Sequence, residues 1–87
     1  MDIYDKLLDI LRKLKPRDDD YTNIKDDEAL TGPKVKLNYI DLVYFFLEIE
    51  KTFNINFNEE DVINYQFNNL KNISSIISKR LIEKRKN

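Results

Sequence analysis

Apolar side chains recur at helical spacing in several stretches of the chain, and the first covers residues 2–14. Positions three or four apart make one stripe there, as on an amphipathic helix. Pro16 follows, and proline disfavours the α region for the residue before it, so the helix is predicted to run from Asp2 to Leu14. The stripe consists of Ile3, Leu7, Ile10, Leu11 and Leu14.

A second helix is predicted from about Tyr39 to Thr52, and it is apolar over almost its whole length. Asn38 suits its N-cap, and Asp41 stands in the capping-box position three residues later. Asn54 fits its C-terminal exit. The predicted core-facing stripe is Leu42, Phe46, Ile49 and Phe53, with Val43 and Phe45 at its flanks.

Two more helices are predicted in the C-terminal half. A short one starts after Asn58, because Glu59, Glu60 and Asp61 suit the first turn of a helix, where the dipole favours negative charge. The last one begins near Asn69. Its apolar face is formed by Leu70, Ile73, Ile77 and Leu81, with Ile76 beside them.

The long polar connection over residues 16–36 is expected to lie against the helices through Ile24, Leu30 and Val35. Its acidic clusters, 18–20 and 26–28, lack the ligand spacing of a calcium loop and are interpreted as solvated loop charge. The only glycine, Gly32, lies in a turn signal and is predicted to have positive φ.

These elements predict an all-α fold: a four-helix bundle with a long first loop and a short third helix. Residues 1–87 are expected to form a single, monomeric domain. The predicted core includes Leu7, Leu11, Phe46, Ile49, Phe53, Leu70, Ile73 and Ile77.

The amino-acid composition excludes several classes of function. The chain has no cysteine and no histidine, which excludes disulfides, thiolate nucleophiles and the commonest general base. The net charge of −1 provides no field that would favour nucleic acid or an anionic membrane. No apolar run approaches the roughly 20 residues of a membrane helix, and the N-terminus has no signal-peptide pattern. We expect a cytoplasmic protein that is not an enzyme and has no metal or cofactor.

Residues 37–57 resemble helix II of an acyl carrier protein and the segment that follows it. In carriers that segment commonly reads Glu-Glu-Phe-x-Ile-x-Ile, and Lys51-Thr52-Phe53-Asn54-Ile55-Asn56-Phe57 keeps the spacing. The chain length, the long first loop and the acidic start of the predicted third helix are also similar. The resemblance covers essentially the whole chain and implies the carrier fold.

The attachment site of a carrier is altered. Helix II of carriers opens with Asp-Ser-Leu, and the serine holds the phosphopantetheine arm; the matching residues are Asn38-Tyr39-Ile40. A transferase shaped for serine is not expected to accept the phenol of Tyr39. Lys36 replaces a glycine of the preceding turn, and Tyr44 and Lys51 stand where carriers often have acids. The resemblance therefore implies a carrier-shaped protein without phosphopantetheine.

Among carrier-like proteins, the chain looks most like the acyl carrier-related proteins of bacterial peptide maturation systems. The segments that carry this likeness are 30–33, 40–44 and 48–51. It implies an adaptor that docks on a biosynthetic or peptide-modifying enzyme through helix II. The alternatives are a true acyl or aminoacyl carrier modified at a non-standard hydroxyl, such as Thr31, and a free-standing structural or regulatory domain.

The candidate docking residues lie on a second apolar face of the predicted helix. Ile40, Tyr44 and Leu47 recur there at i, i+4 and i+7, on a face that the bundle does not need. Either this face is exposed and binds a protein, or the connection over residues 16–36 covers it. The full candidate set is Tyr39, Ile40, Asp41, Tyr44, Leu47, Glu48 and Lys51.

Overall fold

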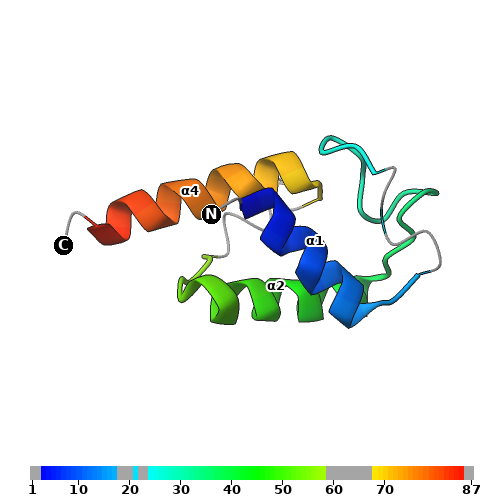
Figure 1. Cartoon of the computed structure of the whole chain (residues 1–87), viewed down its shortest axis with the longest axis horizontal. Helices are drawn as coiled ribbons and strands as arrows, with labels where there is room; N and C mark the ends of the chain where they lie inside the picture. Colours follow the sequence, from blue (N-terminus) through cyan, green and yellow to red (C-terminus); the bar gives the residue numbers. More distant parts are fainter. Residues whose placement is uncertain (1–2, 18–20, 22–23, 59–67, 86–87) are drawn as a thin grey trace.

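The computed structural model describes residues 3–17, 21, 24–58 and 68–85, and its regular elements are three α-helices. They are α1 (Ile3–Leu14), α2 (Tyr39–Phe53) and α4 (Leu70–Arg85). In the view of Figure 1, α2 and α4 run along opposite edges and α1 crosses between them. No strand occurs among the described residues, so this part of the fold is all-helical.

The prediction of a four-helix bundle is wrong, because three helices are found in the described residues. The short helix predicted after Asn58 falls on residues 59–67, which lie outside the described residues. Its sequence signal is an acidic turn followed by a few apolar positions. The other helices begin near their predicted first residues.

One apolar core joins the three helices. Its fully buried residues include Leu7 and Leu11 of α1, Phe45 and Ile49 of α2, and Leu70, Ile73 and Ile77 of α4. One predicted core position is corrected: Phe46 is only partly buried, whereas its neighbour Phe45 is completely inaccessible. The Phe46 ring lies at the edge of the core, with its centroid 4.9 Å from that of Phe57.

The connection between α1 and α2 is part of this core, as predicted. Two backbone hydrogen bonds join it to the start of α4: the Leu30 N–H donates to the Asn68 carbonyl (2.9 Å), and the Lys71 N–H donates to the Asp26 carbonyl (2.8 Å). The connection is therefore held by both packing and hydrogen bonds. Its buried side chains are Tyr21, Leu30, Val35 and Leu37, with Ile24 partly buried.

Gly32 does not have the predicted positive φ. A Cβ at this position would lie 3.1 Å from the Ala29 carbonyl oxygen and 3.3 Å from the Ala29 Cβ, so a larger residue would require Ala29 to shift by a few tenths of an ångström. The left-handed residue of this turn is Lys36, with φ of 58°. Its N–H donates to the Gly32 carbonyl at 2.8 Å, which closes the turn that leads into α2.

Candidate docking surface on α2

The α2 helix is apolar on two opposite faces. The inner face enters the core, and the outer face carries Ile40, Val43, Tyr44 and Leu47, which we call the outer strip. At about 100° per residue, positions i, i+3, i+4 and i+7 lie within one arc of the helix surface. The side chains of the strip are 62%, 40%, 56% and 51% exposed, in chain order.

The described residues of the connection, 16–17, 21 and 24–36, do not cover the outer strip, so of the two alternatives an exposed face is the one observed. The connection places its large apolar side chains in the core instead, including the completely buried Leu30. In Figure 1 α2 runs along one edge of the molecule, on the opposite side from α4. The strip is therefore an uncovered surface of the described fold.

Tyr39 is the first residue of α2 and is 79% exposed. It adjoins the outer strip at the N-terminal end of the helix, next to Ile40. A phenol at this position extends the apolar area of the strip and supplies one hydroxyl at its edge.

Asp41 faces α1 and does not act as a free charge at the rim of the strip. Its Oδ2 accepts hydrogen bonds from Lys15 Nζ (2.8 Å) and from the Asn38 N–H (3.0 Å). The Asn38 Oδ1 in turn accepts from the Asp41 N–H (2.8 Å), which confirms the predicted capping box. These two bonds hold the pKa of Asp41 below its ordinary value, and the hydrogen bond from Lys15 has the larger effect.

The structure changes the membership of the predicted surface. It brings together Tyr39, Ile40, Tyr44 and Leu47, and it leaves Glu48 and Lys51 exposed on the same helix. It adds Val43, which the sequence placed at the flank of the core. Its spacing of three from Ile40 and four from Leu47 is the signal that identifies it as part of the strip.

The outer strip has the composition of a binding surface and not of a catalytic one. Its four side chains include no carboxylate, amine or thiol, and the only heteroatom is the Tyr44 hydroxyl. Among the described residues, no three Asp or Glu side chains lie close enough to hold a metal ion. What the strip can do is remove apolar area from water when another surface covers it.

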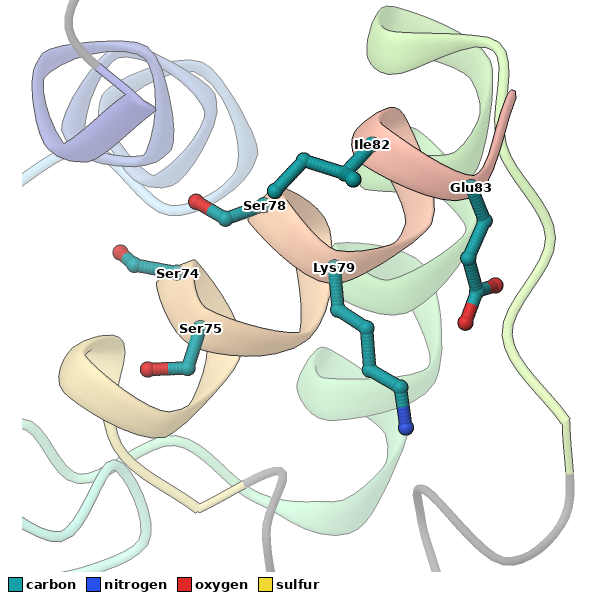
Figure 2. Close-up of a pocket in the computed structure, with 6 residues that line it drawn as sticks. All are labelled: Ser74, Ser75, Ser78, Lys79, Ile82 and Glu83. Atoms are coloured by element: carbon teal, nitrogen blue, oxygen red, sulfur yellow. The ribbon is translucent and has the colours of Figure 1, made fainter. Parts of the chain in front are cut away.

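A second feature is a shallow groove of about 610 Å³ along α4, shown in Figure 2. All the described lining residues come from that one helix. The Ser75 hydroxyl donates to the Lys71 carbonyl (3.1 Å), and the buried Ser74 Oγ makes no hydrogen bond within the described part of the chain. The chain has no histidine, the side chain that most often activates such hydroxyls. The lining residues are Ser74, Ser75, Ser78, Lys79, Ile82 and Glu83.

Comparisons with protein-family models, with curated proteins and with solved structures found no match. None of the described helices has the length and apolarity needed to cross a membrane. The function is therefore argued from the outer strip itself.

Proposed function

We propose that this protein is a cytoplasmic, non-enzymatic adaptor related to the acyl carrier proteins, which docks on a biosynthetic or peptide-modifying enzyme through the outer strip of α2. The observation that carries the proposal is the exposure of four neighbouring apolar side chains on one helix face. The largest contiguous apolar patch on a monomeric protein is often a functional surface.

The spacing of the strip indicates the mode of docking. Anchors at i, i+3, i+4 and i+7 are typical of a helix that lies in an apolar groove of its partner. Tyr44 is the expected centre of the contact, since buried aromatic side chains dominate many interfaces. The exposed charges of Glu48 and Lys51 should affect the rate of encounter more than the affinity.

Docking is tested with purified enzymes encoded beside the gene for this protein, by calorimetric titration. Leu47→Asp should weaken binding at least tenfold, because it places a charge in the buried centre of the contact. The matched control is Ile82→Asp, since Ile82 is similarly exposed (56%) but lies on α4. The proposal fails if both variants bind like the parent, or if Leu47→Asp lowers the melting temperature substantially, because Leu47 would then belong to the core.

The absence of a prosthetic group is tested separately. Incubation with a promiscuous phosphopantetheinyl transferase and coenzyme A, followed by intact mass measurement, should leave the mass unchanged. A stoichiometric gain of one arm would favour the alternative function, a true carrier modified at a non-standard hydroxyl. Peptide mapping would then show which hydroxyl carries the arm.

A further inference from the structure

The outer strip is symmetric about its own midpoint. Positions i, i+3, i+4 and i+7 have the same spacing in either direction along the helix. A two-fold axis through this midpoint, perpendicular to an antiparallel pair of α2 helices, places Ile40 of one copy against Leu47 of the other. Val43 and Tyr44 then each lie beside their own counterparts. An isologous contact requires such a self-complementary pattern.

We propose that two copies of this chain pair through their outer strips, with the α2 helices antiparallel, in a weak and reversible dimer. The dimer would cover the surface that docks on the enzyme, and this consequence rests on the proposed function. The proposal departs from the expectation of a monomer, because the exposed strip offers an apolar surface to a second copy.

The size of the strip indicates a weak contact. With ordinary side-chain areas, the exposed fractions of Tyr39 and the four strip residues amount to roughly 500 Å² per copy. Permanent interfaces bury about 800 Å² or more on each partner, and contacts below about 1,200 Å² in total are usually transient. The apolar area is thus large enough for association at high concentration and too small for an obligate dimer.

The charges beside the strip tolerate the antiparallel arrangement. Glu48 and Asp41 lie on the same flank of α2, so the two-fold axis brings Glu48 of one copy toward Asp41 of the other. The Asp41 carboxylate is already paired with Lys15 at 2.8 Å. Because that pair has no net charge, Glu48 meets no uncompensated negative charge.

The consequence is a competition between two uses of one surface. Only the monomer presents the outer strip, so self-association lowers the amount of protein that can dock. A ligand that binds one state shifts the equilibrium toward it, and the enzyme would therefore dissociate the dimer. The fraction of this protein that is free to dock should fall as its total concentration rises above the dissociation constant of the dimer, although the concentration of free monomer still increases.

The test is sedimentation equilibrium of the protein alone, from about 10 μM to about 1 mM, a range that covers weak association. The parent and Ile82→Asp should show the same concentration-dependent dimer. Ile40→Lys and Leu47→Glu should each weaken dimerisation at least tenfold. An equimolar mixture of the two should associate again. One half of its interface pairs the new ammonium with the new carboxylate, and the other half keeps Ile40 against Leu47.

The register is checked by oxidative cross-linking, for which the absence of natural cysteine is useful. Tyr44→Cys should form a homodimer, because the position lies beside the two-fold axis. Leu47→Cys should cross-link with Ile40→Cys and not with itself. In a parallel pair of helices, Leu47→Cys would cross-link with itself and not with Ile40→Cys. That result would overturn the proposal.

A parent that stays monomeric to 1 mM would also overturn it. The proposal would also be overturned if Ile40→Lys and Leu47→Glu do not associate when mixed, provided that circular dichroism shows both variants to be folded. These measurements contain no enzyme, so their failure leaves the proposed docking untouched. Conversely, a dimer that forms while no enzyme binds would refute the proposed function alone.

Discussion

At the scale of single residues, Asp41 shows how one carboxylate fixes the positions of two helices. It caps α2 through the Asn38 N–H and holds the end of α1 through Lys15. The cap is readable in the sequence, because its two residues are three positions apart. The ion pair is not, because Lys15 lies 26 residues away and its approach depends on how α1 packs on α2.

The first prediction concerns the pH dependence of this contact. The pKa of Asp41 is lower in the folded than in the unfolded chain. Its contribution to stability is therefore full above the unfolded pKa of about 3.9 and is lost as the pH falls through the folded pKa. Asp41→Asn should lower the free energy of unfolding by about 0.5–1 kcal/mol at pH 7, and this deficit should shrink as the pH falls through the folded pKa. Urea denaturation at several pH values measures both.

The control for this experiment is Asp9→Asn. Asp9 pairs with Arg12 at 3.0 Å, but its side chain is 65% exposed, so the variant should differ little from the parent at any pH. An Asp41→Asn deficit that stays unchanged as the pH is lowered would show that the charge of Asp41 does not stabilise the fold.

Residues with positive φ show a limit of sequence interpretation. Asn54 was expected at the exit of α2 and has the left-handed conformation there, with φ of 54°. Gly32, the residue best suited to positive φ, does not have it, whereas Lys36 does. Lys36 is forced into this conformation by hydrogen bonds around it, from its own N–H to Gly32 and from Leu37 to Leu30. Residue type alone does not reveal such constraints.

At the scale of the element, the double-faced character of α2 explains why one core position was predicted wrongly. In α1 a single stripe of apolar residues points inward, and the predicted core residues Leu7 and Leu11 are both buried. In α2 apolar residues lie on both faces, so periodicity no longer identifies the inner one. Phe45 and Phe46 differ by about 100° around the helix, and only packing against α1 and α4 selects between them.

The second prediction compares these two rings. Phe45→Ala should cost about 3–5 kcal/mol, because it removes a completely buried ring and leaves a cavity. Phe46→Ala should cost about half as much, since that ring is only partly buried at the edge of the core. Chemical denaturation at pH 7 measures both. Equal costs, or a larger cost for Phe46→Ala, would mean that α2 is rotated relative to the described packing.

At the scale of the whole molecule, helix positions follow from the sequence better than the arrangement of the parts. Helices leave a local signal of stripes and caps, which placed α1, α2 and the start of α4. The number of helices and the exposure of the outer strip depend on contacts between distant segments. Whether a long connection covers Ile40 and Leu47 or enters the core is decided by partners such as Asn68, which no local pattern indicates.

The third prediction follows from those distant contacts. The Leu30 and Lys71 amides bond to segments far away in the chain, so they should exchange with solvent only when the connection leaves the core. Both should be strongly protected in native-state hydrogen exchange, with similar free energies of opening. The Glu28 amide, which donates to the nearby Lys25 carbonyl, should exchange by a smaller local opening.

Leu30→Ala sharpens this prediction, because it removes a completely buried side chain at the junction and should cost about 2–5 kcal/mol. If the connection and the start of α4 open together, the variant lowers the protection of Lys71 as much as that of the residues beside position 30. Lys34→Ala, at an exposed position of the same connection, should change neither. Protection of Lys71 that survives Leu30→Ala would show that α4 folds without the connection, and the connection would then be an appendage of the helices. If the amides of both regions lose protection together, the connection is part of the cooperative core. Its packing in the core then also explains why it does not cover the outer strip.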